Sequence, residues 1–292
     1  MYRVRFAGSA WRLCRAAALA AATAGFVPHN AGAQGRVEAR YTAALAGIPI
    51  GRGTWVIDIG ADQYTTAASG RAGGVLRLFA NGEGTGAARG AVNRGRLVAG
   101  TFSSAYTTRH DSYDVRMGLA GGAVKDLKTD PPYEPSPDRV PLTDAHRRGV
   151  LDPMTAALMT VTGTGGLLTP EACRQRLPIF DGRQRFDIVM SFKRMENVQS
   201  QKGYSGPAVV CTALYEPIAG HRPGRYAIQY LRETRDIEIW LVPIAGTRLV
   251  VPYRISVPTL LGAATLQATQ FETEAQAPRP TSATSTLRAR RM

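Results

Sequence analysis

Residues 185–192 read RFDIVMSF, a stretch in which every second side chain is large and apolar. The apolar positions are Phe186, Ile188, Met190 and Phe192. A period of two is typical of a β-strand with one buried face, because successive side chains of a strand point to opposite sides of the sheet. An Asp181-Gly182 pair precedes the stretch and favours a turn. These residues therefore predict a strand that is entered from a turn.

The same alternation recurs along most of the chain. Further strands are expected at residues 37–45, 55–59, 64–68, 96–107, 113–119, 209–214, 226–231, 237–241, 249–257 and 263–271. Residues 73–79 fit either a short helix or a bend in a strand. Short strands at this spacing favour an antiparallel arrangement. The predicted fold class is mainly β: a single curved antiparallel sheet, or an open β-barrel or spiral, with one or two short helices.

One segment has the signals of a helix start. Asp152 suits the N-cap and Pro153 the first helical position. Apolar residues then follow at helical spacing, at Met154, Ala157, Leu158 and Val161. We expect a helix over residues 152–162, closed by a glycine and packed into the concavity of the sheet. Before it, the proline-punctuated residues 129–141 predict a surface excursion between two halves of the fold.

The first 33 residues have the three parts of a secretory signal peptide. Four arginines precede an apolar run at residues 16–27, and Ala31-Gly32-Ala33 suits the cleavage site. The run is shorter than the roughly 20 residues that a membrane-spanning helix needs. We expect a periplasmic protein with a β domain at residues 34–272 and a disordered basic tail at 273–292. A retained N-terminal anchor is the alternative.

Two cysteines, Cys173 and Cys211, lie beyond the predicted leader, which contains the third, Cys14. In an oxidising compartment an even pair of cysteines favours a disulfide. We therefore predict a bridge between Cys173 and Cys211. A catalytic or metal-binding cysteine is the competing interpretation, although neither residue has a CxxC partner or a histidine nearby.

No motif for catalysis or for metal or cofactor binding stands out. The histidines have no HxH or HExxH spacing, and there is no GxSxG sequence. His110, with Asp111 and Asp114, has the residue types for base catalysis but fits a polar hairpin turn better. Residues 82–86, GEGTG, resemble part of a phosphate-binding loop without its GK[ST] ending. We expect no cofactor and no metal, and a binding or structural role rather than an enzyme.

The charge of the chain bears on its partners. The formal net charge of +14 falls by four to +10 when the leader arginines are removed. Outside the cytoplasm a basic protein meets anionic lipid and cell-wall polymer rather than nucleic acid, so peripheral membrane contact is an expected mode of binding. A high-GC coding bias would also account for the arginine-rich composition without any such partner. The sequence leaves the oligomeric state open.

Three motifs together resemble one family. They are residues 46–51, AGIPIG, after a tyrosine-containing strand; residues 151–158, LDPMTAAL; and residues 179–187, IFDGRQRFD. This combination is similar to the DUF3108 family of exported bacterial proteins of unknown function. The resemblance spans nearly the whole chain after the leader and transfers no catalytic residue. By fold-level analogy with other periplasmic proteins of this size, we also expect a curved antiparallel sheet similar to that of the LolA and LolB lipoprotein carriers and of the periplasmic β-spiral envelope-integrity proteins.

The apolar strand faces suggest a non-enzymatic envelope protein that holds an acyl chain or a hydrophobic peptide in a concave β face. The candidate ligand-facing residues are Met154, Leu158, Phe186, Ile188, Met190 and Phe192. The alternative is that these side chains fill one another as core. Two other functions remain open. The first is an interaction protein that binds anionic lipid or wall polymer through its basic surface and tail. The second is a hydrolase with an unrecognised site at His110.

Overall fold

The computed structural model describes residues 34–73 and 82–277. The predicted signal peptide and most of residues 73–79 lie outside this range. Among the described residues, no helix has the length and apolar character to cross a membrane. The last strand continues to Ala275, so the expected tail boundary at residue 273 falls inside a strand, and residues 278–292 are not described.

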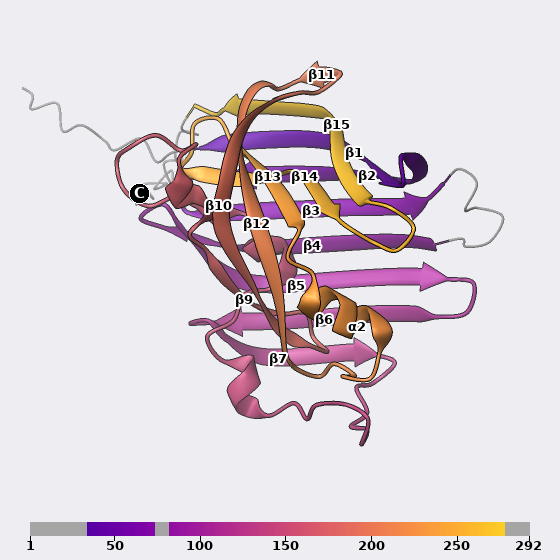
Figure 1. Ribbon diagram of the computed structural model, residues 1–292. Helices are drawn as coiled ribbons and strands as arrows, with labels where there is room; N and C mark the ends of the chain where they lie inside the picture. Colours follow the sequence, from indigo (N-terminus) through magenta and orange to yellow (C-terminus); the bar gives the residue numbers. More distant parts are fainter. Residues whose placement is uncertain (1–33, 74–81, 278–292) are drawn as a thin grey trace, which may run out of the picture. The chain divides into compact units, whose positions relative to one another are not determined.

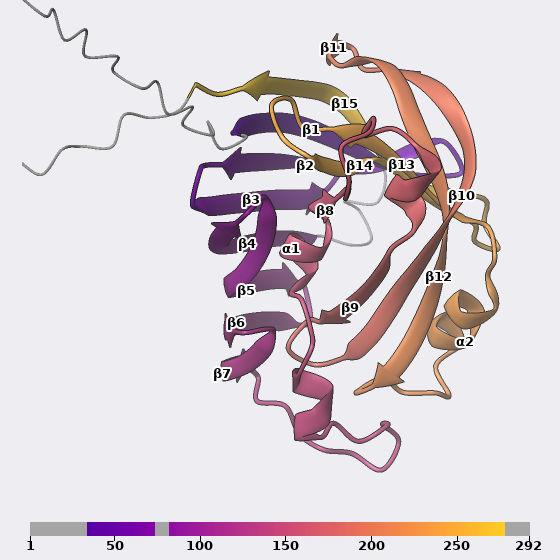
Figure 2. The same cartoon turned by 90° about the vertical axis from the view of Figure 1, so that its left-hand side faces the viewer.

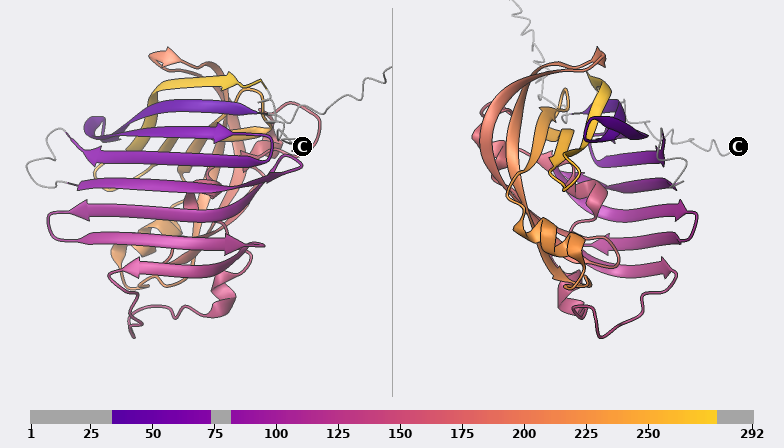
Figure 3. Two further views of the ribbon diagram at one scale, coloured as in Figure 1. Left: turned by 180° about the vertical axis from the view of Figure 1, so that it is seen from behind. Right: turned by 45° about the vertical axis from the view of Figure 1, so that its right-hand side comes forward.

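The first half of the domain is a meander of seven antiparallel strands, stacked in chain order in Figure 3. They are β1 (Gly35–Leu45), β2 (Ile48–Ile59), β3 (Gln63–Ala72), β4 (Gly82–Asn93), β5 (Arg96–Thr108), β6 (Ser112–Ala120) and β7 (Ala123–Asp130). Alternate residues of β1 and β2, such as Val37 and Ile57, are fully buried. The period of two in the sequence therefore corresponds to one buried face.

The second half continues the same sheet from the β1 edge, in the order β1-β15-β14-β13-β12-β10-β9. Its elements are η2 (Asp144–Arg147), α1 (Pro153–Ala156), β8 (Met159–Thr160), η3 (Pro170–Cys173), β9 (Arg176–Phe180), β10 (Arg185–Gln199), β11 (Lys202–Gly203), β12 (Ser205–Ala219), α2 (Tyr226–Glu233), β13 (Ile237–Pro243), β14 (Leu249–Val257) and β15 (Ala264–Ala275). Figure 1 labels these elements, and Figure 2 shows the two halves facing each other with α1 between them. The prediction of a curved, mainly antiparallel β fold with short helices is confirmed.

The two outer strands of the sheet, β7 and β9, are joined by a short connecting segment that runs between them. Val150 donates its backbone N–H to Gly122 at the β6–β7 turn (2.9 Å), and Leu151 donates to Pro178 of β9 (2.8 Å). Phe180 returns a backbone hydrogen bond to Leu151 (2.9 Å). The segment therefore supplies partners to both edges, which would otherwise present unpaired backbone groups.

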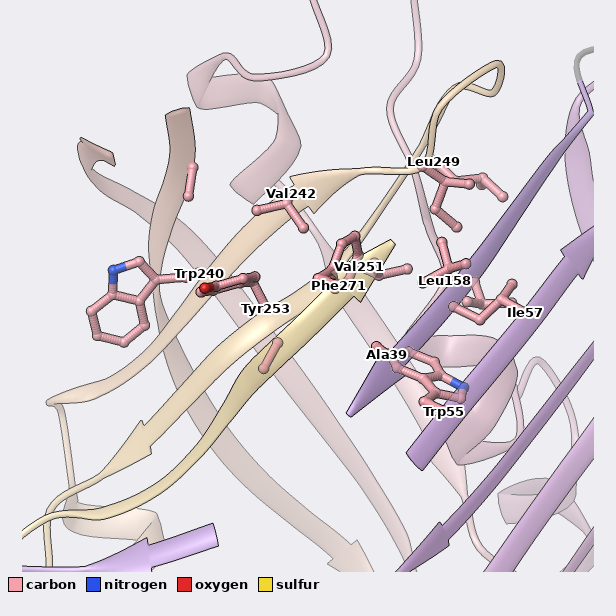
Figure 4. Packing of buried hydrophobic residues seen from close by; sticks show 14 of the residues in the cluster. Ala39, Trp55, Ile57, Leu158, Trp240, Val242, Leu249, Val251, Tyr253 and Phe271 are labelled. Carbon is pink, nitrogen blue, oxygen red and sulfur yellow. The ribbon is translucent and has the colours of Figure 1, made fainter. Parts of the chain in front are cut away.

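Apolar clusters lie on both faces of the β12–β13 pair, because alternate residues of each strand belong to different clusters. Val210 and Trp240 belong to the main cluster, which also contains Ile57 and Leu158 and is shown in Figure 4. Val209, Cys211 and Leu241 belong to a second cluster, covered by η3 and β8. In the middle of these strands, at Ala208–Cys211 and Trp240–Val242, both faces are therefore buried.

Two secondary-structure predictions, one of a helix and one of a strand, need correction. The helix expected at residues 152–162 ends after one turn, at Ala156. Met159 and Thr160 instead pair with Val250 and Leu249 of β14. The added strand pairing overrides the helical spacing of the apolar residues, since tertiary contacts outweigh local propensity.

The strand expected at residues 226–231 is the helix α2. The alternation of Tyr226, Ile228 and Tyr230 fits both structures, but Tyr226 and Tyr230 are also four residues apart. In the helix their rings stack with centroids 5.9 Å apart. Leu231 packs on the second cluster, which fixes the helix against the sheet.

The structure also places the glycine-rich and turn residues that the sequence analysis singled out. Residues 82–86, which resemble a phosphate loop, lie within β4 and not in a loop. His110 and Asp111 form the exposed turn between β5 and β6, where both donate backbone N–H groups to the Thr108 hydroxyl, as the turn interpretation predicts. The proline-rich excursion is irregular after β7 ends at Asp130.

The disulfide between Cys173 and Cys211 is present, as predicted. It joins η3 to β12, and both cysteines are fully buried in the second cluster. The bridge closes a loop across a sequence separation of 38 residues. In the unfolded chain such a cross-link removes conformational freedom, which stabilises the native state.

Replacing both cysteines by alanine is expected to lower the free energy of unfolding by about 4 kcal/mol, the loop-closure contribution for this separation. Urea unfolding of the oxidised protein and of the Cys173→Ala/Cys211→Ala variant measures the difference. Mass mapping under non-reducing conditions provides the control. Two free thiols in the native protein, or equal unfolding midpoints, would contradict the assignment.

Candidate functional site: an apolar cavity and an arginine-lined cavity

One stretch of the inward face of β2, β3 and β4 has unusually small side chains. In register, Gly53 pairs with Gly70, which pairs with Gly84. In the adjacent row, Ala68 of β3 pairs with Gly86 of β4. Because these positions carry a methyl group or no side chain, the space above them is filled only by what the opposite layer provides.

An apolar cavity of about 520 Å³ opens above these small residues. Its apolar lining comes from both halves of the sheet and from α1: Tyr41, Ile50, Trp55, Met154, Ile255 and Leu266. The polar groups of its aromatic residues are satisfied elsewhere. The Tyr41 hydroxyl donates to Pro252 O (2.7 Å), and Trp55 Nε1 donates to the Thr66 hydroxyl (2.6 Å). The cavity therefore presents mainly hydrocarbon surface to an occupant.

Helix α1 holds Met154 over the cavity floor through a buried polar cluster. Asp152 accepts hydrogen bonds from the backbone N–H (2.9 Å) and hydroxyl (2.5 Å) of Thr155. The Thr155 hydroxyl also lies 2.6 Å from the hydroxyl of Tyr64, on β3. A side chain at Gly86 would place its Cβ only 3.2 Å from the sulfur of Met154. Glycine there allows the helix to sit close to β4.

A second cavity, of about 630 Å³, shares Ala68, Ser69, Gly70 and Met154 with the apolar cavity. We call it the basic cavity, because four arginines line it: Arg139, Arg183, Arg222 and Arg225. Asp181 is the one carboxylate among its described lining residues. The two cavities thus adjoin along one strip of β3 while differing in chemical character.

Three separate segments bring the arginines together, and they meet at Gly220. Arg139 Nη1 donates to Gly220 O (2.8 Å), and the Gly220 N–H donates to Val140 O (2.8 Å). A Cβ at Gly220, where φ is +80°, would lie 2.0 Å from the Arg183 carbonyl oxygen. Glycine therefore permits the end of β12 to contact the turn at residue 183.

The turn that carries Arg183 is itself built by Asp181. Its carboxylate accepts the backbone N–H groups of Arg183 (2.8 Å) and Gln184 (2.7 Å). Burial raises the pKa of Asp181, although these two hydrogen bonds act to lower it. The Arg183 guanidinium lies over the Tyr113 ring, 4.6 Å from its centroid, and that ring stacks on Tyr106 at 4.8 Å. The arginine is held in place by an aromatic face rather than by an acidic partner.

A polar groove of about 860 Å³ lies largely on the opposite face of β1–β5. Its charged lining residues are Arg40, Arg52, Arg71 and Glu83. These residues alternate along their strands with the inward-facing positions, for example Arg52 with Gly53. The groove and the apolar cavity nonetheless share lining residues of β1–β3, among them Tyr41, Arg52 and Arg71. In the described part of the chain, no group of three or more His, Cys, Asp or Glu residues is placed to hold a metal ion.

The six residues predicted to face a ligand are not brought together. Met154 lines both cavities, and Leu158 is buried in the main cluster. Ile188 and Met190 pack in the second cluster, on the disulfide side of β12, and Phe186 packs on Tyr215 of the same face. Phe192 is 41% exposed. Whether any of them contacts a ligand stays a prediction.

Sequence reasoning missed the small residues that create the cavity and the arginines of the basic cavity. One available signal was the alternation of glycine at residues 82, 84 and 86, which places three glycines on one face of a strand. The arginines carried no comparable signal, because they come from segments far apart in the sequence.

Comparison with known families assigns the chain. The model of DUF3108, described as a protein of unknown function, matches residues 40–269. The chain belongs to the DUF3108 family. The resemblance predicted from the three motifs is thereby confirmed, and both cavities lie within the DUF3108 domain.

No curated protein matches the DUF3108 protein. Among solved structures, it is similar to the crystal structure of a β-barrel-like protein of domain of unknown function DUF1849 from Brucella abortus. The sequence identity is 8% and the TM-score is 0.41, over 83% of this chain and 98% of that chain.

The pKa of Asp152, raised from its ordinary value of 3.8 by burial, leads to a pH dependence of stability. A carboxyl whose folded-state pKa is raised contributes stability below its ordinary pKa, and this contribution is lost as the pH rises through the folded pKa. Asp152→Asn retains an N-cap acceptor but cannot ionise. We expect denaturant unfolding from pH 3.5 to 7.5 to show that the free energy of unfolding of the variant rises relative to that of the wild type as the pH increases. A constant difference across this range would contradict the prediction.

Proposed function

We propose that this DUF3108 protein is a non-enzymatic protein of the bacterial envelope that binds a lipid or another long-chain hydrophobic ligand. The observation that carries the proposal is the apolar cavity, about 520 Å³, between the two halves of the sheet. This volume lies within the range of about 300–1,000 Å³ typical of small-molecule sites. Its floor of glycine and alanine leaves room that large side chains would fill.

A periplasmic location supports the same function. The buried Cys173–Cys211 disulfide is consistent with an oxidising compartment, where such bridges persist.

The alternative hypothesis of a hydrolase needed a pocket joining His110 to a carboxylate. His110 lies in the exposed β5–β6 turn and lines neither the apolar nor the basic cavity.

Filling the cavity provides the test. Ala68→Leu and Gly70→Leu each add a side chain to the shared floor, and a Cβ at Gly70 would meet only one atom, at 3.7 Å. Both variants are expected to weaken binding of a fluorescent fatty acid by about ten-fold or more, equivalent to 1.4 kcal/mol. Native mass spectrometry of protein purified from its own envelope is expected to show a bound lipid in the wild type and less in both variants.

Ala67→Leu is the matched control, because Ala67 is the neighbouring residue of β3 and faces the opposite, exposed side of the strand. It is expected to bind as the wild type does. If wild type and all three variants bind equally, or if none of them binds, the apolar cavity is not the ligand site.

A second candidate function, peripheral contact with an anionic membrane, is supported by two exposed apolar turns beside the same cavity. Ile48 (56% exposed) lies at the β1–β2 turn, and Leu260 (78%) and Leu261 (73%) lie at the β14–β15 turn. The two turns are tied together by a hydrogen bond from Ala46 N to Ala263 O (2.9 Å). Adjacent apolar tips of this kind suit insertion among lipid headgroups.

Vesicle sedimentation tests this contact. The Leu260→Ser/Leu261→Ser variant is expected to lose most of its binding to phosphatidylglycerol vesicles, because it removes the two most exposed apolar side chains of the tip. Val98→Ser, at an exposed position on β5, is the control and is expected to bind normally. Binding by the double variant at the wild-type level would exclude the turn as the contact. Weaker binding at high salt would identify an electrostatic contribution.

A further inference from the structure

The basic cavity has unsatisfied polar groups in addition to its charge. His221 is 6% exposed and lines this cavity, yet its Nδ1 has no hydrogen-bond partner among the described residues. The buried Nε of Arg183 is likewise without an acceptor in that part of the chain. A buried donor without a partner is costly, so native structures rarely retain one without a ligand, a water or an ion to satisfy it.

The charge of the cavity indicates what kind of atom would satisfy these groups. Four arginines face one carboxylate, and that carboxylate, of Asp181, already accepts two backbone N–H groups. Arg222 is paired at 2.7 Å with Asp138, whereas Arg183 is held by an aromatic ring and a carbonyl oxygen, that of Pro131. Guanidinium groups bind planar or tetrahedral oxyanions through charge-assisted hydrogen bonds. The complementary ligand group is therefore an anion with several oxygens.

The position of this anion site relative to the apolar cavity determines the rest of the ligand. Ala68, Ser69, Gly70 and Met154 line both spaces, so an occupant can extend from one to the other along β3. Resting on the proposed function, we infer that the basic cavity binds the phosphate or carboxylate head group of an anionic amphiphile whose hydrocarbon chain occupies the apolar cavity. Arg183 and Arg225 contact the head group, and His221 donates its Nδ1–H to one of its oxygens.

Binding of matched ligands to the intact domain tests this assignment. The probes are a lysophosphatidic acid, a monoacylglycerol with the same chain, and inorganic phosphate, measured by isothermal titration calorimetry at physiological salt. The wild type is expected to bind the lysophosphatidic acid at least about ten-fold more tightly than the monoacylglycerol, because only the former has an anionic head group.

Two variants locate the preference. The double variant Arg183→Gln/Arg225→Gln is expected to lose the preference for lysophosphatidic acid while its binding of monoacylglycerol stays unchanged. The variant Arg225→Lys is expected to retain most of this preference. Arg235→Gln removes an exposed charge just beyond α2, outside the cavity lining, and is the control for net charge. Circular dichroism of each variant establishes that it folds, and the retained binding of the neutral ligand provides a second check.

The outcomes separate the two proposals. Equal binding of the charged and neutral lipids overturns the head-group assignment but leaves the hydrophobic ligand in place. If inorganic phosphate binds as tightly as lysophosphatidic acid, the proposal that one amphiphile occupies both cavities is overturned, since the basic cavity would then be an independent anion site. If the wild type binds neither lipid, the proposed function itself is overturned.

Discussion

A buried carboxylate holds the middle of the chain between the two halves of the sheet. Asp152 caps the single turn of α1 by accepting the backbone and hydroxyl hydrogens of Thr155, whose hydroxyl in turn contacts Tyr64 on β3. Immediately before it, Val150 and Leu151 bond to the turn before β7 and to β9. One short segment thus joins the open edges of the sheet and sets how closely its layers approach.

The spacing that this segment imposes gives the small residues their effect. Where β1 and β2 present Val37, Ile57 and Ile59, the layers meet in a filled core. Where β3 and β4 present glycine and alanine, the same separation leaves a cavity with Met154 at its boundary. The domain is therefore stabilised by conventional packing in one part of its interior and has a cavity where the side chains are small.

Local patterns in the sequence were sufficient for the elements that depend on neighbouring residues. The alternation in 185–192 and in nine of the ten other segments predicted strands correctly, and the Asp152-Pro153 pair predicted a helix start, because caps and periodicity are properties of a few consecutive residues. The cysteine pair predicted the disulfide through the chemistry of the compartment. Glycine-rich β4 was missed as a strand because its apolar face lacks the side chains that make alternation visible.

The sequence by itself determined the fold class, the family and the bridge between Cys173 and Cys211. Tertiary structure decided where the helix ended, since pairing of Met159 with β14 replaced further helical turns. It also decided which apolar faces meet, and it separated Met190 from Met154. The convergence of arginines from three distant segments at Gly220 depends on register and chain crossing. No local sequence pattern predicts these features, because they are contacts between distant segments rather than properties of any one segment.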